Sequence, residues 1–325
     1  MRTGQRPEDV VGAALPRLAA AITRIRAAAV VVQGDTASAF AGAVAGQYAQ
    51  VPVAHVEAGL RTYSADPFPE EFHRRVIAQA AQWHFAPTAA AVAALAREGI
   101  AAHAVHLVGN SGIDALLHAA ARLAADAALC ARSDAVLPPA DPARPLLLAT
   151  VHRRENHGPR LASIADALKI LAARAQVVVP VHPSPAVQAA LTARLAGIAN
   201  VHLLPPLGYL PFVRLLSRAR LVLTDSGGVQ EEAPALGVPV LVMRACSERP
   251  EGIAAGGALL VGTATATIVR AALRLLDDDV AHAKMAQVRL PYGDGRAGER
   301  IAAVLAAAVA GECLAERRAE ALQAV

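Results

Sequence analysis

Short apolar runs alternate along the chain with loops and with stretches in which apolar residues recur at helical spacing. Continuous apolar strands that alternate with helices predict parallel sheets covered by helices on both faces. Thr88 as N-cap and Gly99 as stop signal bound one of the predicted helices. The runs that predict buried strands are Ala29–Gln33, Val53–Glu57, His106–Val108, Leu146–Val151, Val177–Val181, Val201–Leu204, Leu221–Thr224 and Pro239–Met243.

One segment interrupts this alternation. Residues 130–145, CARSDAVLPPADPARP, hold four prolines and show no apolar periodicity, which predicts a linker between two α/β domains. The predicted domains are residues 1–137 and 138–300, and residues 301–325 form a C-terminal helix that packs on the first domain or on a partner. Ligands of open α/β sheets bind beyond the carboxyl ends of the strands, so a substrate cleft is expected there.

Composition narrows the function classes. The net charge is +4, but the basic residues are scattered and aromatic residues make up only 3%, so nucleic-acid binding is not expected. The sequence has neither an apolar run long enough to span a membrane nor the apolar core of a signal peptide, and a cytoplasmic protein is expected. The three cysteines are far apart and lack CxxC spacing, which argues against a disulfide framework or a zinc site.

Three carboxylates of the first domain are candidates for acid–base chemistry. Asp35 and Glu57 each stand at the end of a predicted strand, and Glu70 opens a helix that begins at Pro69. Each also has a structural alternative: Asp35 as a helix cap, Glu57 as a partner of Arg61, and Glu70 as an i,i+4 partner of Arg74.

The second domain carries candidates for anion binding. His152 is followed by two arginines at the end of one predicted strand, and His182 follows the next strand. After a third strand, Ser226, Gly227 and Gly228 open a helix whose free amides can hold a phosphate. Glu232 lies one turn further and is placed to accept ribose hydroxyls. The structural alternative for the glycine pair is a tight strand–helix turn.

These motifs, taken together, resemble a known family. The chain resembles the non-hydrolysing UDP-N-acetylglucosamine 2-epimerases, in order and spacing, from about Gly4 to the C-terminal helix. The motifs are GDT at 34–36, HVEAGLR at 55–61, PEE at 69–71, HRREN at 152–156, PVHP at 180–183, TDSGGVQEEAPALGVPVLVMR at 224–244, ERPE at 248–251 and PYGDG at 291–295.

The resemblance implies a GT-B-like fold of two Rossmann-like domains, a homodimer, and a UDP-sugar as substrate. It implies inversion at C2 that interconverts UDP-N-acetylglucosamine and UDP-N-acetylmannosamine, by elimination of UDP to a bound 2-acetamidoglucal and readdition. Neither a metal nor a nicotinamide cofactor is implied.

The resemblance also implies residue roles. Asp35, Glu57 and Glu70 are the acid–base carboxylates, and His152 meets the diphosphate and protonates it as it leaves. Arg74, His182 and Arg249 contact the substrate or position the carboxylates. Phosphate is held by Ser226, Gly227 and Gly228, ribose by Glu232, and uracil is flanked by the loop that contains Phe212.

The chain departs from the family pattern at three places. His73 and Leu290 stand where the family usually has Asn. The strand, GTRPE motif and lysine with which family members open have no counterpart, so the first domain is expected to lack its initial strand–helix units, and activity is expected to suffer. The alternatives are therefore a catalytically weak or dead nucleotide-sugar-binding protein and a sugar-nucleotide hydrolase on the same scaffold.

Overall fold

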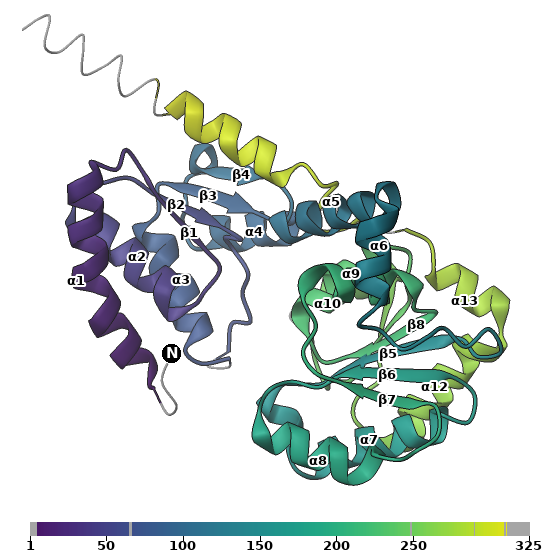
Figure 1. Cartoon of the computed structure of the whole chain (residues 1–325). Helices are drawn as coiled ribbons and strands as arrows, with labels where there is room; N and C mark the ends of the chain where they lie inside the picture. The colour runs from purple at the N-terminus through teal and green to yellow at the C-terminus, as the bar shows by residue number, and fades with distance from the viewer. Residues whose placement is uncertain (1–4, 65–66, 248, 289, 309, 311–325) are drawn as a thin grey trace, which may run out of the picture. The chain divides into compact units, whose positions relative to one another are not determined.

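The structure is a computed structural model that describes residues 5–64, 67–247, 249–288, 290–308 and 310. The chain forms two compact units, Met1–Ser111 with Tyr292–Val325 and Gly112–Pro291. Each unit is built on one parallel sheet (Figure 1). The predicted α/β fold with two parallel sheets is therefore confirmed.

The first unit holds a four-stranded sheet in the order β1-β2-β3-β4. Residues 297–308 add a further helix to this unit. Its elements are α1 (Pro7–Ile25), β1 (Val30–Gln33), α2 (Ala37–Tyr48), β2 (Val53–Val56), α3 (Glu70–Ala80), β3 (Trp83–Ala86), α4 (Ala89–Arg97), η1 (Ala102–Ala104) and β4 (Val105–Leu107).

Local sequence signals set the ends of two helices in the first unit. The predicted N-cap at Thr88 is confirmed, because its hydroxyl accepts the amide of Ala91 at 3.2 Å, and Gly99 follows α4 with a φ of +81°. Helix α3 begins at Glu70, one residue later than predicted, so Pro69 is its N-cap residue and not its first helical residue.

Residues 297–308 pack against the first sheet. Ile301 joins a buried cluster with Ala54, Val56, Phe85 and Val108, and further apolar residues of the same helix cover it. The chain returns to this unit through a close backbone approach, in which a Cβ on Gly109 would lie 3.0 Å from the Cα of Gly293. The remainder of the predicted C-terminal helix, residues 309 and 311–325, lies outside the described residues.

The second unit holds a six-stranded sheet in the order β10-β9-β8-β5-β6-β7. Its elements are α5 (Ser111–Ala125), α6 (Ala127–Asp134), β5 (Leu146–Thr150), η2 (Arg154–Asn156), α7 (Pro159–Leu171), β6 (Gln176–Pro180), α8 (Pro185–Leu195), β7 (Val201–Leu204), α9 (Tyr209–Arg218), β8 (Leu221–Thr224), α10 (Gly227–Ala235), β9 (Val240–Val242), α11 (Pro250–Ala254), β10 (Ala258–Leu260), α12 (Thr265–Asp277) and α13 (Asp279–Met285).

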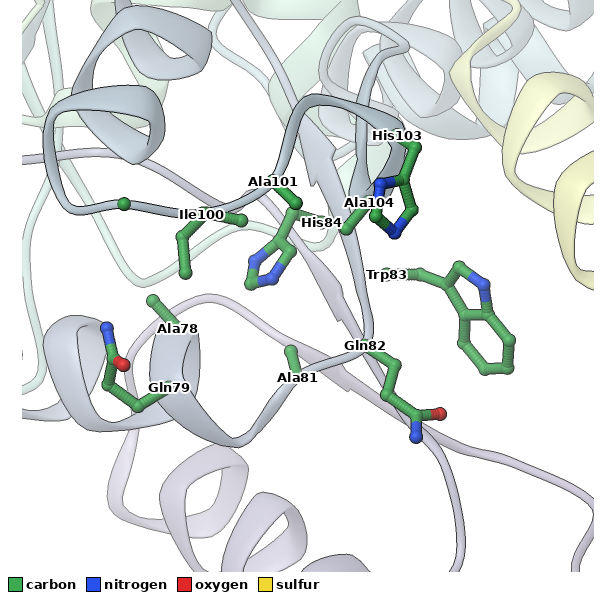
Figure 2. A pocket seen from close by; sticks show the side chains of 11 residues that line it. Ala78, Gln79, Ala81, Gln82, Trp83, His84, Ile100, Ala101, His103 and Ala104 are labelled. Carbon is green, nitrogen blue, oxygen red and sulfur yellow. The ribbon is translucent and has the colours of Figure 1, made fainter.

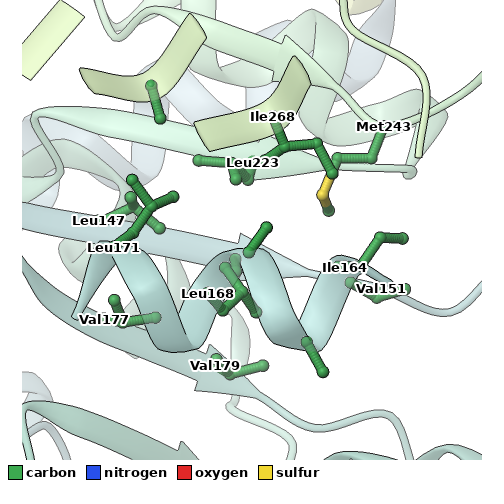
Figure 3. Close-up of a cluster of buried hydrophobic side chains, with 14 of the residues drawn as sticks. Leu147, Val151, Ile164, Leu168, Leu171, Val177, Val179, Leu223, Met243 and Ile268 are labelled. Carbon is green, nitrogen blue, oxygen red and sulfur yellow. The ribbon is translucent and has the colours of Figure 1, made fainter. Parts of the chain in front are cut away.

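The core of the second unit explains why its strands read as continuous apolar runs. Leu147 of β5 packs with Leu168 of α7 and Ile268 of α12 in one large cluster (Figure 3). Leu146 and Leu148 point to the opposite face and are also buried. Both faces of this sheet are therefore covered, as a parallel sheet requires.

Helices α5 and α6 group with the second unit, whereas residues 112–137 were predicted to belong to the first domain. Asp134 at the end of α6 accepts hydrogen bonds from Arg214 at 3.0 Å and Arg218 at 2.9 Å, both on α9. Asp126 caps α6 by accepting the amide of Leu129, and the helix that begins there includes residues 130–134. The prediction of a linker over residues 130–145 is therefore wrong for its first five residues.

In the described part of the chain, none of the helices combines the length and the apolar character that crossing a bilayer requires.

Candidate active site

In the first unit, Glu57 lies against the backbone turn that follows β1 and carries Asp35. Strands β1 and β2 run parallel with Gln33 opposite Val56, so Asp35 and Glu57 leave the same edge of the sheet. A Cβ built on Gly34 would lie 3.2 Å from the Oε2 atom of Glu57. The carboxylate of Glu57 therefore lies over the Gly34 backbone, beside Asp35.

Glu57 reaches this position through an unusual backbone conformation. Strand β2 ends at Val56, and Glu57 has a φ of +67°, a region that non-glycine residues rarely adopt. Regular strand alternation would place Glu57 on the same face as His55, but the alternation ends at Val56 because of this conformation. Such strain is typical of functional sites, where the surrounding structure holds it.

The structural roles considered for Asp35 and Glu57 are filled by other residues. Thr36 caps α2 by accepting the amide of Ala39 at 3.1 Å, so Asp35 is not needed as a cap. Arg61 donates to both carboxylate oxygens of Glu98 at 2.7 Å, which neutralises this buried guanidinium without Glu57.

Helix α3 holds Asp35 from one side. Arg74 is buried and donates to the Oδ2 atom of Asp35 from Nε at 2.8 Å and Nη2 at 2.7 Å. The neighbouring His73 contacts the Asp35 carbonyl at 2.7 Å. Glu70, the predicted third carboxylate, is the first residue of the same helix and is half-buried. Its approach to Asp35 stays a prediction.

Glu71, which follows Glu70, orders the loop before α3. Its carboxylate is buried, accepts the amides of Thr62 and Tyr63 at 3.0 and 3.2 Å, and pairs with Arg74 at 3.3 Å. Burial alone would raise the pKa of Glu71, but these amides and the Arg74 charge lower it below its ordinary value. Glu71 thus ties Arg74 to the loop that follows Glu57.

In the second unit, Asp225 joins the ends of β5 and β8. It is fully buried and accepts the amides of His152 and Arg153, both at 3.0 Å, and the side-chain amide of Asn156 at 2.9 Å. Its Oδ1 atom also lies 3.1 Å from Nδ1 of His152. Burial opposes the charge, but the bond to His152 and the other donors lower the pKa of Asp225.

The two predicted histidines of this unit lie together. The rings of His152 and His182 stack with centroids 5.8 Å apart and an angle of 24°. Asp225 contacts Nδ1 of His152, and Nδ1 of His182 accepts the amide of Ser184 at 3.2 Å. In both rings Nε2 is the nitrogen that these contacts leave for a ligand.

Two guanidinium groups converge on the first turn of α10. A Cβ on Gly227 would lie 3.5 Å from Nη2 of Arg153 and 3.8 Å from Nη2 of Arg249. Ser226 is the N-cap residue, and the first amides of a helix have no partner within it. Amides, the helix dipole and two cations at one point form an anion site.

A buried carboxylate holds the side chain of Arg249. Its Nε donates to Glu231 of α10, and both side chains are buried. Arg153 is not one of the predicted site residues, although the two arginines after His152 predict an anion-binding cluster. Its register beside Gly227 depends on Asp225, which sequence spacing does not reveal.

Glu232 lies next to this anion site on α10. Burial, together with the charge of Glu231, raises the pKa of Glu232 to about 7. At the start of α9, burial and then the charge of Glu232 raise the pKa of Tyr209 to about 12. Phe212 lies on the same first turn of α9 and is half-buried.

A hollow of the first unit lies away from these carboxylates. It measures about 440 Å³ and is lined by residues that include Trp83, His84 and His103 (Figure 2). These residues surround the amino end of β3, whereas Asp35 and Glu57 follow the carboxyl ends of β1 and β2. None of the predicted site residues lines it. In the described part of the chain, no cluster of three His, Cys, Asp or Glu side chains can hold a metal ion.

The structure thus combines two parallel α/β sheets with carboxylates after the strands of one sheet and two arginines at a helix start in the other unit. The family model of UDP-N-acetylglucosamine 2-epimerase matches residues 2–306. The chain belongs to this family.

Individual proteins of this family are similar to the chain over most of its length. The "Probable UDP-N-acetylglucosamine 2-epimerase" of Ralstonia solanacearum is 47% identical over 276 residues, 84% of this chain and 74% of the relative. The UDP-N-acetylglucosamine 2-epimerase of Escherichia coli K12 is 41% identical over 307 residues, 93% of this chain and 81% of the relative.

Solved structures are similar as well. The Neisseria meningitidis UDP-GlcNAc 2-epimerase bound to UDP-GlcNAc has a TM-score of 0.90 and 38% identity, covering 94% of this chain and 83% of its own. The S. aureus MnaA–UDP co-structure has a TM-score of 0.83 and 35% identity, covering 91% and 80%. These structures support the GT-B-like assignment, and the family is one of isomerases.

Proposed function

We propose that the chain interconverts UDP-N-acetylglucosamine and UDP-N-acetylmannosamine. The observation that carries this proposal is the anion site at α10, where Arg153 and Arg249 meet the helix N-terminus in a member of an epimerase family. The similar N. meningitidis enzyme is described as bound to UDP-GlcNAc, which supports the same substrate here.

The first half of the reaction is an elimination. A carboxylate takes the proton from C2, the C1–O bond breaks, and its electron pair leaves with UDP, so that 2-acetamidoglucal forms. Asp35, Glu57 and Glu70 are the proposed acid–base groups, and Arg74 orients the carboxylate of Asp35. Readdition of UDP to C1, with a proton delivered to the other face of C2, gives the epimer.

The second unit stabilises the departing diphosphate. The amides of Gly227 and Gly228, the hydroxyl of Ser226 and the guanidinium of Arg249 are its proposed ligands, and His182 stacks beside His152. Asp225 holds Nδ1 of His152, which leaves Nε2 to donate a proton to the leaving group. Donors arranged in advance around developing charge typically supply the largest part of catalysis.

The nucleoside end is proposed to lie at the starts of α9 and α10. Glu232 accepts ribose hydroxyls, and Phe212 flanks the uracil. A homodimer and a cytoplasmic location complete the proposal.

Product analysis tests this proposal. The chain is incubated with UDP-N-acetylglucosamine, and nucleotide sugars, free UDP and free sugar are separated by chromatography. UDP-N-acetylmannosamine is the expected product, without accumulation of free sugar. Release of UDP and free sugar in place of the epimer indicates a hydrolase, and an unchanged substrate with a folded protein contradicts the proposal.

A further inference from the structure

The turn that carries Asp35 is held by two imidazoles and one guanidinium. Nε2 of His55 contacts the carbonyl of Gly34 at 2.9 Å, and Nδ1 of His73 contacts the carbonyl of Asp35 at 2.7 Å. Arg74 holds the Asp35 carboxylate at 2.7 Å. The side chains of His55, His73 and Arg74 thus hold the Gly34 carbonyl, the Asp35 carbonyl and the Asp35 carboxylate, respectively.

His73 is built to act as a donor in this arrangement. A carbonyl oxygen only accepts, so Nδ1 of His73 must carry the proton. The ring is 3% exposed and stacks on Phe40 with centroids 4.8 Å apart and an angle of 25°. Phe72 lies against it at 5.9 Å. Aromatic packing therefore fixes the ring plane, and with it the direction of the N–H bond.

The position of His73 links it to the proposed chemistry. His73 and Arg74 are consecutive residues of α3, and they hold the backbone and the carboxylate of the same residue. If the Asp35 carbonyl is released, the peptide can rotate, and the carboxylate then no longer meets the fixed Arg74 fork at 2.7–2.8 Å. A displacement of about 1 Å in a reacting group can cost roughly a hundredfold in rate.

We propose that His73 is a positioning residue for Asp35, through the bond from Nδ1–H to the Asp35 carbonyl. This inference rests on the proposed epimerase function. The side chain of Asn carries its amide on the same Cγ branch as Nδ1, so the donor, and not the imidazole as such, is the property that matters.

Two substitutions separate the donor from the packing. His73→Phe keeps an aromatic ring against Phe40 and removes the donor, whereas His73→Asn keeps a donor and removes the ring. His103→Phe, at an exposed residue outside the site, is the matched control for exchange of imidazole for phenyl. Turnover of UDP-N-acetylglucosamine is measured for all three and for the unsubstituted chain.

His73→Phe is expected to lower kcat by roughly ten- to a hundredfold with KM nearly unchanged. His73→Asn is expected to retain kcat within about threefold, and His103→Phe to behave like the unsubstituted chain. Full activity of His73→Phe, or equal losses for His73→Phe and His73→Asn, overturns the inference.

Crystal structures of the two His73 variants give a readout that does not need activity. The Asp35 carbonyl is expected to turn away in His73→Phe and to accept from Asn in His73→Asn. An unchanged Asp35 turn in His73→Phe overturns the inference even if the unsubstituted chain shows no turnover, a result that by itself counts only against the proposed function.

Discussion

In both units, charged side chains are held in position by partners that are far away in the sequence. Arg61 pairs with Glu98 and Arg74 with Asp35, so the nearby carboxylates Glu57 and Glu70 are not required to balance them. Likewise, Asp225 organises His152 and Arg153 across 73 and 72 residues of sequence. The same long-range pairs that stabilise the fold therefore orient the proposed catalytic groups.

One residue-scale prediction concerns the anion site. Ser226→Trp places an indole over the first turn of α10, where Arg153 and Arg249 converge. UDP binding, measured by titration calorimetry, is expected to weaken by at least about tenfold, which corresponds to about 1.4 kcal/mol.

Ser217→Trp provides the control for that experiment, because Ser217 is exposed on α9. It is expected to bind UDP like the unsubstituted chain. Equal UDP affinity of both Trp variants would place the phosphate elsewhere.

A second residue-scale prediction concerns pH. His55 is fully buried, and burial lowers its pKa from 6.5 to about 4. The unfolded chain therefore binds a proton at higher pH than the folded chain, and stability falls as the pH drops from about 6.5 towards 4.

Between pH 7 and pH 5, His55 should lower the free energy of unfolding by about 2 kcal/mol, and His84, whose pKa burial also lowers to about 4, acts in the same direction. Urea denaturation followed by circular dichroism measures this difference. His103→Gln, which alters an exposed histidine, should preserve it. Equal stability at both pH values would mean that His55 is not buried in its neutral form.

At the scale of elements, most strands were predictable because parallel strands buried on both faces read as apolar runs. Strands β3 and β10 were missed for local reasons: β3 contains Trp83 and the buried His84, and β10 has only three residues after two glycines. Strand β3 is stabilised by pairing with β2 and β4, and β10 by pairing with β9, and sequence periodicity does not record such pairing.

In the candidate site, too, local sequence signals predicted some features, and others depend on tertiary contacts. The sequence placed Asp35, His152 and Ser226 at strand ends because strand ends are visible as changes from apolar to polar residues. The positive φ of Glu57 and the approach of Arg153 to Gly227 depend on tertiary contacts, and no local signal predicts them.

Two glycines give a matched test of element packing. Gly59 and Gly99 have φ values of +87° and +81°, but only at Gly59 would a Cβ collide, at 2.3 Å from the carbonyl of Ala91 on α4. Gly99→Ala is expected to cost about 1 kcal/mol through backbone strain. Gly59→Ala adds overpacking of about 1–3 kcal/mol.

Thermal denaturation of both glycine variants measures the difference. A clearly lower Tm for Gly59→Ala than for Gly99→Ala is expected. The same Tm for both would show that the contact between the β2–α3 loop and α4 is loose.

At the scale of the whole molecule, apolar side chains of the first unit remain at the surface. Val31 on the edge strand β1 is 53% exposed, and Ile25 and Tyr48 at the ends of α1 and α2 are 66% and 79% exposed. Apolar surface beside an open strand edge favours self-association. Light scattering of the purified chain is expected to show a dimer or a larger species, and a well-behaved monomer at micromolar concentration would contradict the proposed homodimer.

The central claim is that this chain inverts C2 by removing and returning a proton. The most direct test is incubation with UDP-N-acetylglucosamine in deuterium oxide, followed by NMR of the recovered nucleotide sugars. Because the carboxylates exchange their proton with solvent, deuterium is expected at C2 of UDP-N-acetylmannosamine and, after equilibration, of UDP-N-acetylglucosamine. Formation of the epimer with its original hydrogen at C2, or the absence of both epimer and deuterium in a folded protein that binds UDP, would contradict the account.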